Sequence, residues 1–364
     1  MTEAREISEA EFEQLAIGAW ILCTGGGGDP YHSLLNMKKL TRQGTRVTLI
    51  DPAALADDDL VAVVSHMGAP LVSRERLPDP EMIARAVRLM EQFQKCKFAA
   101  VMSIEIGGSN ALQPFLAAAL LDLPVVDADA MGRAFPSIYH TSFAVAGLAC
   151  DPFAMIDIRG NSVVISEGKD WLWMERISRA VSTEFGCRAF TCKAPRTGRE
   201  VKEAAVLYTV SQAIAIGRTV QAARVVHADP VRAVIDSEGG ALLFNGKVRD
   251  VSRRTTDGYL RGKVLIQGLD QDSGHEFRIE FQNEFLVGTC DGAVRVTVPD
   301  LICVLDSNSG EAVGTEALRY GQRVTVIALP SPPVFLSEAG LRHAGPGAFG
   351  YDLVFQSLFG KKAA

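Results

Sequence analysis

The sequence lacks the patterns that identify several common classes of protein. Its seven cysteines form no CxxC pair, and its six histidines form no HExxH motif, so neither a zinc knuckle nor a zincin-type site is indicated. No apolar run is long enough to span a membrane, and residues 1–13 lack the basic and apolar regions of a signal peptide. We therefore expect a cytoplasmic protein with reduced thiols.

The sequence also lacks clusters of charged residues of one sign. No cluster of lysine and arginine stands out, and a net charge of −6 provides no attraction to nucleic acid or to an anionic membrane. The 364 residues suit two domains with an ample core, because 48% are hydrophobic and only 22% are charged. A small molecule is the expected partner, and the sequence leaves a homo-oligomer open.

The first half of the chain alternates short apolar runs with amphipathic stretches. This pattern predicts a layered α/β/α domain with a mostly parallel sheet. Strands are predicted at Thr45–Ile50, Leu60–Ser65, Phe98–Ile104 and Pro124–Val126. Helices are predicted at Tyr31–Arg42, Asp79–Lys95, Ser109–Leu121, Trp171–Phe185 and Glu200–Arg224.

The pattern changes after residue 230 to short β-rich runs separated by turn residues, which predicts a barrel-like antiparallel part. These runs are Ala241–Val251, Gly262–Gly268, Glu276–Phe281, Phe285–Thr289, Ala293–Val298, Leu301–Leu305 and Arg323–Ala328. We expect an α/β domain at residues 1–168 and a C-terminal domain at residues 169–364, barrel-like at about 230–330. The helices of 169–228 and the tail of 334–360 are candidates for packing back on the α/β domain.

The most unusual feature that is present is the run Gly25-Gly26-Gly27-Gly28, between Thr24 and Asp29. Residues without a Cβ let the backbone approach a ligand closely. The loop fits neither the P-loop pattern nor the dinucleotide fingerprint, since no Lys-Ser/Thr follows it and Pro30 replaces a required glycine. If the preceding apolar stretch is a strand, the loop lies at a ligand-binding sheet edge. The alternative is that the glycines only let the following helix pack tightly.

Carboxylates follow two of the predicted strands. Glu105 comes directly after Phe98–Ile104 and precedes Ser109 and Asn110, whereas Asp127 and Asp129 follow Pro124–Val126, with Arg133 beyond them. The carboxyl ends of parallel strands meet at one edge, so these side chains are expected beside the glycine loop. Two carboxylates on one side of an extended segment can share a metal, or one can act as a general base. The structural alternative is that these groups only hold neighbouring loops together.

Histidine and cysteine side chains lie near the same predicted edge. His66 ends the strand Leu60–Ser65, and His140 follows the aspartates closely. Cys23 could act as a nucleophile if one of these histidines served as its base, although a free cysteine more often packs as a small hydrophobe. The sequence leaves the catalytic roles of Cys23 and His140 open. A divalent metal, if one binds, would take Asp127, Asp129, Glu105 and His66.

Four segments together resemble the S-methyl thiohydantoin desulfurase-like family in order and spacing. They are Thr24–Tyr31 (TGGGGDPY), Glu105–Asn110 (EIGGSN), Pro124–Pro136 (PVVDADAMGRAFP) and Gly345–Asp352 (GPGAFGYD). The resemblance covers nearly the whole chain and implies an α/β domain followed by a β-rich domain. It also implies cleavage of a C–S bond in a thiohydantoin-type ring, giving a hydantoin and a thiol or sulfide, and association with hydantoinase- or oxoprolinase-type proteins.

The expected mechanism is hydrolytic. Water activated by Asp127, Asp129 or Glu105 attacks the ring carbon that bears sulfur, and Arg133 holds an acyl oxygen or carboxylate of the substrate. The expected substrate-binding residues are Thr24, Gly25, Gly26, Gly27, Gly28, Asp29, Ser109, Asn110 and His66. Two alternatives stay open: a non-catalytic partner or regulator of a hydantoinase- or oxoprolinase-type enzyme, and another cyclic amidohydrolase that retains sulfur.

Overall fold

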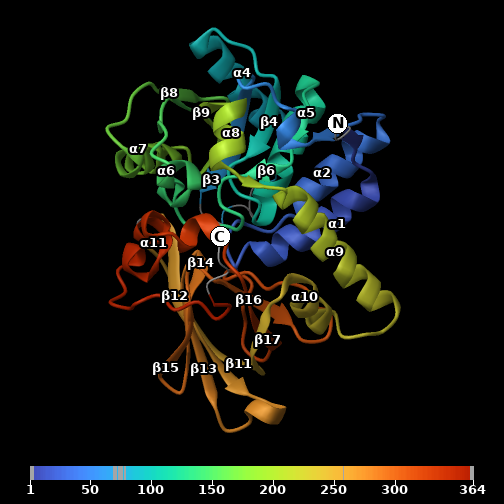
Figure 1. Cartoon of the computed structure of the whole chain (residues 1–364), viewed down its shortest axis with the longest axis vertical. Coiled ribbons are helices and arrows are strands. Elements are labelled where there is room, and N and C mark those ends of the chain that lie inside the picture. The colour runs from blue at the N-terminus through green and yellow to red at the C-terminus, as the bar shows by residue number, and fades with distance from the viewer. Residues whose placement is uncertain (1–3, 69–71, 73–76, 78, 257, 361–364) are drawn as a thin grey trace.

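Two large β-sheets organise the chain. The computed structural model describes residues 4–68, 72, 77, 79–256 and 258–360, and these form a mixed eight-stranded sheet and a curled antiparallel seven-stranded sheet (Figure 1). The first sheet and its helices fill the upper part of the view, and the second fills the lower part. The predicted fold class is confirmed.

The first sheet has a parallel centre and antiparallel flanks. Its strand order is β1-β2-β5-β4-β3-β9-β7-β8. The parallel strands are β2 (Thr48–Ile50), β5 (Val125–Val126), β4 (Ala100–Ser103) and β3 (Leu60–Gly68). The antiparallel strands are β1 (Arg5–Glu6), β9 (Arg188–Thr197), β7 (Phe153–Ile156) and β8 (Ser162–Ile165). All four predicted strands of this sheet are present, in shorter or longer form.

Helices cover both faces of this sheet. One face packs against α1 (Glu9–Leu22), α2 (Tyr31–Arg42), α4 (Glu81–Gln94), α5 (Gln113–Leu121) and α9 (Thr209–Val225). The other packs against α6 (Ser142–Val145), α7 (Trp171–Glu184), α8 (Gly198–Ala204) and α11 (Glu338–Ala344). Short 3-10 helices lie at Pro52–Ala54, Gly108–Leu112, Ile138–His140, Asp270–Asp272, Pro333–Leu336 and Pro346–Phe349. Within the described chain, no helix has both the length and the apolar character to cross a membrane.

The second sheet contains the seven predicted β-rich runs in the order β15-β14-β13-β12-β11-β17-β16. Helix α10 (Pro230–Glu238) precedes it. Its strands are β11 (Ala241–Thr256), β12 (Tyr259–Gly268), β13 (Glu276–Gln282), β14 (Glu284–Cys290), β15 (Ala293–Thr297), β16 (Leu301–Asp306) and β17 (Arg323–Leu329). Alternating inward side chains, Phe244, Val264, Phe277 and Phe285 among them, form its core. This alternation explains why the strands were predicted well.

Two expectations about elements were wrong, and one long strand was missed. The apolar stretch before the glycine loop is helix α1, whose start is fixed by a capping box between Ser8 and Glu11. The predicted helix Glu200–Arg224 is interrupted by β10 (Val206–Leu207), which pairs with β6 (Ala128–Asp129). Strand β9 was missed because it carries three basic residues, which are unusual in a buried strand: Arg188, Lys193 and Arg196.

Helices α1 and α9 cross with their backbones nearly in contact. A Cβ on Gly18 would lie 1.9 Å from the carbonyl oxygen of Ala213, and a Cβ on Gly217 would lie 1.9 Å from that of Gln14. Both distances are far inside van der Waals contact, so only glycine fits at either position. Because α1 leads into the glycine loop, this crossing determines where the loop begins.

We predict that Gly18→Ala lowers the free energy of unfolding by at least ~1–3 kcal/mol, the usual cost of overpacking. Alanine is favoured over glycine within a helix by roughly 1 kcal/mol, but the clash with Ala213 outweighs this gain. Urea denaturation measures the change. The control is Gly347→Ala, because a Cβ there meets nothing within 4 Å. Equal stability of the two variants would show that the helices do not cross this tightly.

Candidate functional site

The glycine loop lies where the two sheets meet. The backbone N–H of Phe285 donates to the carbonyl of Thr24 at 2.8 Å, and that of Thr315 donates to the carbonyl of Gly25 at 2.8 Å. A Cβ on Gly26 would lie 1.8 Å from Glu284 Oε1. Gly26 therefore allows tight packing against the second sheet, whereas Gly27 allows it against the loop after β4, where a Cβ would lie 2.6 Å from the carbonyl oxygen of Gly107.

A cavity opens beside this junction, with a volume of about 590 Å³ that includes its open mouth. A concave site lined by apolar and polar side chains suits a small molecule rather than a macromolecule. Polar side chains and the loop backbone supply its chemistry, and they come from elements of both sheets. These cavity residues are Gly27, Gly28, Ser65, His66, Glu105, Asn110, Ser137, Arg179, Asn283 and Glu284.

Glu105 is buried at the cavity, just beyond Ile104, the residue that follows β4. Asn110 donates its side-chain amide to Glu105 Oε1, and the backbone N–H of Phe135 donates to Oε2 at 3.3 Å. Burial raises the pKa of Glu105 to about 7, against the lowering effect of the Asn110 hydrogen bond. Asn110 also accepts from the backbone N–H of His66 at 2.8 Å, so it joins the end of β3 to this carboxyl group.

Glu284, the first residue of β14, is a second cavity carboxyl group that the sequence analysis missed. Its side chain accepts from the backbone N–H of Gly27, and among the described residues its buried Oε2 has no hydrogen-bond partner. Burial, and next the charge of Glu105, raise the pKa of Glu284 well above its usual range. No local pattern could identify this residue, because it reaches Glu105 only when the two sheets meet.

His66 is half-buried at the end of β3, close to the glycine loop. A Cβ on Gly28 would lie 3.7 Å from His66 Nε2. Burial, together with the nearby charges of Arg188 and Lys193, lowers the pKa of His66 to about 3. Its ring is therefore neutral at neutral pH and can donate or accept one hydrogen bond at a bound ligand.

Arg179 of α7 is a second cavity residue that the sequence analysis did not identify. Its guanidinium group is positively charged. Its Nε donates to Glu175 at 2.5 Å, and its guanidinium lies 4.2 Å from the centre of the Tyr259 ring. The Tyr259 hydroxyl donates to the same Glu175 oxygen at 2.9 Å and contacts Ser137 at 2.7 Å. This network joins α7 to β12 and holds the arginine at the cavity wall.

Asp127 and Asp129 do not reach the cavity, contrary to the expected arrangement. Asp129 is fully buried and accepts from the backbone N–H groups of Ile106 at 2.7 Å and Gly132 at 2.9 Å. Asp127 accepts from the backbone and hydroxyl of Ser211, in the first turn of α9, at 3.0 and 2.5 Å. Each carboxylate thus holds a different segment in place, as in the structural alternative.

Three other predicted site residues also have partners outside the cavity. Arg133 is fully buried and donates to Thr24 Oγ1 at 2.7 Å and to the carbonyl of Pro299 at 3.0 Å, so it ties the loop to the second sheet. Ser109 Oγ lies 2.8 Å from Ser33 Oγ. Asp29 is exposed and accepts from the backbone N–H of Tyr31 at 2.9 Å, at the start of α2.

The structure shows the surroundings of Cys23 and His140, whose catalytic roles the sequence left open. Cys23 is buried, its thiol donates to the carbonyl of Trp20 at 2.9 Å, and burial raises its pKa well above the usual range. His140 lies among aromatic rings, 4.0 Å from Tyr139 and 4.6 Å from Phe349 between ring centres. Burial lowers the pKa of His140 well below its usual range. Neither residue lines the cavity.

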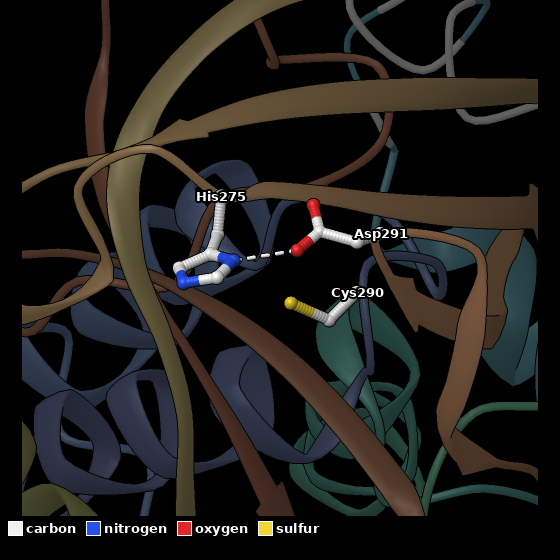
Figure 2. Close-up of side chains that lie close together, drawn as sticks. All are labelled: His275, Cys290 and Asp291. Carbon is white, nitrogen blue, oxygen red and sulfur yellow. Dashed lines mark hydrogen bonds and ion pairs between the residues drawn. The ribbon is translucent and has the colours of Figure 1, made fainter.

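The four candidate metal ligands do not come together. Three or more His, Cys, Asp or Glu side chains whose ligand atoms lie within 4.8 Å of one another could hold a metal ion. In the part of the chain that the structure describes, one group meets this condition: His275, Cys290 and Asp291 (Figure 2). His275 Nδ1 lies 2.5 Å from Asp291 Oδ2. Cys290 ends β14, the strand that Glu284 begins, so this group lies away from the cavity. Of the four candidates, Glu105 and His66 line the cavity, whereas Asp127 and Asp129 do not.

Comparison with known families identifies both halves of the chain. The S-Me-THD-like N-terminal domain matches residues 10–167, and the S-Me-THD-like C-terminal domain matches residues 169–358. The chain belongs to the S-Me-THD-like family.

One solved structure is similar over nearly its whole length. It is the X-ray crystal structure of a protein from Chromobacterium violaceum, with a TM-score of 0.82 and 24% identity, over 97% of this chain and 99% of that one. At this identity, the likeness supports the fold alone. No curated protein matches the chain significantly.

We predict that Asp129→Asn lowers the free energy of unfolding by about 1–3 kcal/mol, because an amide nitrogen cannot accept from the N–H groups that the carboxylate binds. The matched control is Asp236→Asn, in an exposed i,i+4 pair with Arg232, which should change stability by less than about 0.5 kcal/mol. Urea denaturation compares the two. An Asp129→Asn protein as stable as the control would contradict the assigned structural role.

The raised pKa of Glu105 predicts a pH dependence of stability. Glu105 has a pKa of about 7 in the folded protein, against the ordinary glutamate value of 4.5 in the unfolded chain, so the folded state binds more protons between these values. The free energy of unfolding should fall as pH rises through this window, by up to ~3 kcal/mol relative to Glu105→Gln. Urea denaturation at several pH values tests this, and parallel curves for the two proteins would contradict it.

Proposed function

We propose that the chain hydrolyses the C–S bond of a thiohydantoin-type ring, giving a hydantoin and a thiol or sulfide. The observation that carries this proposal is the pair of buried carboxyl groups, Glu105 and Glu284, at one cavity in a member of the S-Me-THD-like family. Such a pair shares protons, because two neighbouring buried carboxylates resist being charged together. One group can therefore act as a base while the other acts as an acid.

Glu105 is the proposed general base. A carboxyl group with a pKa of about 7 is partly ionised at neutral pH, so it can accept a proton from the attacking water. Glu284 keeps its proton and donates it to the ring nitrogen that gains electrons as water attacks. The C–S bond then breaks as the new hydroxyl group gives its proton to Glu284 and becomes the ring carbonyl, and sulfur leaves as a thiolate that takes the proton held by Glu105.

Other cavity residues position the ring. The Arg179 guanidinium is proposed to hold the ring carbonyl or a carboxylate substituent with the N–H groups that remain beside its hydrogen bonds to Glu175, Pro136 and Gly258. Apolar side chains of Ile104, Met131 and Phe135 line the same cavity and suit the flat faces of a small ring. The roles expected for Asp127, Asp129 and Arg133 are thereby reassigned to residues that reach the cavity.

The direct test is to incubate the purified protein with S-methyl thiohydantoins. Methanethiol is measured with a thiol reagent, and the ring products are separated by mass spectrometry. Wild-type protein should release thiol and form a hydantoin with the ring intact. Absence of thiol and sulfide with every thiohydantoin tried would refute the proposal, and ring opening with sulfur retained would favour the amidohydrolase alternative.

We predict that Glu105→Gln lowers kcat by roughly 10²–10⁴-fold, the usual contribution of general base catalysis. Glutamine keeps the size and the Asn110 contact but cannot accept the proton of water. The matched control is Glu338→Gln, because this side chain is 93% exposed and forms a surface ion pair with Arg342. Equal kcat for the two variants would remove Glu105 from the mechanism.

A further inference from the structure

A lysine and a serine hydroxyl meet at the cavity, and the mechanism above uses neither. Ser65 of β3 lies opposite Thr191 of β9, and Val63 lies opposite Lys193, so the side chains of Ser65, Thr191 and Lys193 share one face of the sheet. Lys193 Nζ lies 2.5 Å from Ser65 Oγ and 2.5 Å from Thr191 Oγ1. Ser65 lines the cavity, with Lys193 buried beside it.

Lys193 has no ion-pair partner among the described residues. Its polar contacts are the two hydroxyls, and its Nζ lies 5.2 Å from the centre of the Phe153 ring. Burying an ammonium group without a carboxylate is costly, so the neutral amine is favoured. Burial lowers the pKa of Lys193 to about 7, although the more distant charges of Glu105 and Glu175 act in the opposite direction. A neutral amine can accept a proton from the serine hydroxyl.

The burial of Lys193 beside Ser65 favours a chemical role for this pair over simple packing. Burying a lysine is energetically unfavourable, since its charge must be removed and its long side chain must be ordered. The next residue, His66, is held through its backbone by Asn110, which also binds Glu105. The same hydrogen-bonded junction therefore holds the serine hydroxyl and the proposed general base at one cavity.

We propose that Ser65 is the nucleophile of the reaction and Lys193 its base, so that C–S cleavage passes through an isourea-type ester on Ser65. This proposal rests on the proposed function. The Ser65 proton passes to Lys193 as Oγ bonds to the ring carbon that bears the S-methyl group, and the C=N electron pair moves to the ring nitrogen. That pair then returns, the C–S bond breaks, and methanethiolate leaves with the proton from Lys193.

The second half of the reaction releases the ester. Glu105 takes a proton from water as the water oxygen bonds to the same ring carbon. The C–Oγ bond breaks, Ser65 regains its proton from Glu105, and the hydroxyl proton of the adduct moves to the ring nitrogen. The products are a hydantoin and methanethiol, with no net oxidation or reduction. Glu105 thus keeps the role of activating water, but acts on the ester.

The test is rapid-quench kinetics with an S-methyl thiohydantoin. Wild-type protein should release about one equivalent of methanethiol per active site before steady-state turnover, and the quenched protein should carry the ring mass on the Ser65 peptide. Ser65→Ala and Lys193→Met should form no adduct and lose at least about 10³-fold in kcat. The control is Lys97→Met, because this lysine is 86% exposed, and it should keep both the burst and the adduct.

A fluorophosphonate probe gives a second measurement that does not depend on turnover. It should label Ser65 in the wild-type protein and in Lys97→Met, but not in Lys193→Met, whose folding is checked by circular dichroism. Turnover without labelling, together with a Ser65→Ala kcat within tenfold of wild type, would overturn the nucleophile and leave the proposed function intact. Labelling of Ser65 without turnover of any thiohydantoin would support the nucleophile and refute the proposed substrate. Neither labelling nor turnover would overturn both.

Discussion

The packing of Gly26 against the carboxyl group of Glu284 is the contact on which the cavity depends. There is no room for a Cβ between them, and backbone hydrogen bonds from Phe285 and Thr315 hold the loop on the second sheet. The buried guanidinium of Arg133 strengthens the same junction from the other side of the loop. This junction brings a carboxyl group of the second sheet to Glu105 of the first, which neither sheet could achieve alone.

The acidic residues near this junction illustrate how hydrogen-bond partners and access to the cavity decide the role of a side chain. Asp129 is completely satisfied by backbone N–H groups of adjoining segments, and Asp127 holds the first turn of α9. Glu105 and Glu284 are buried, as Asp129 is, and burial raises the pKa of all three carboxyl groups, but only Glu105 and Glu284 among these three line the cavity. Buried carboxyl groups that line a cavity are expected of a reacting site, whereas those enclosed by the N–H groups of adjoining segments are typical of structural support.

Much of the fold was predictable because local patterns carried the information. The helix Tyr31–Arg42 has the predicted bounds, and the seven runs of the second sheet were found because one face of each strand is apolar. Prediction failed where tertiary contacts override local pattern. Helix α1 is packed against both the sheet and α9, which leaves it too apolar to show helical periodicity, and β9 carries a lysine that only its neighbours make tolerable.

The sequence by itself determined the family, the order of the elements and the presence of Glu105, Asn110, His66 and the glycine loop near one edge of a sheet. Each of these follows from a motif or from residues close together in the chain. Only the tertiary structure decided that Glu284 and Arg179 join them, that Asp127 and Asp129 turn away, and that Lys193 meets Ser65. The physical reason is that hydrogen bonds and desolvation at this site come from distant segments, and strand periodicity specifies a face but not the neighbour that will cover it.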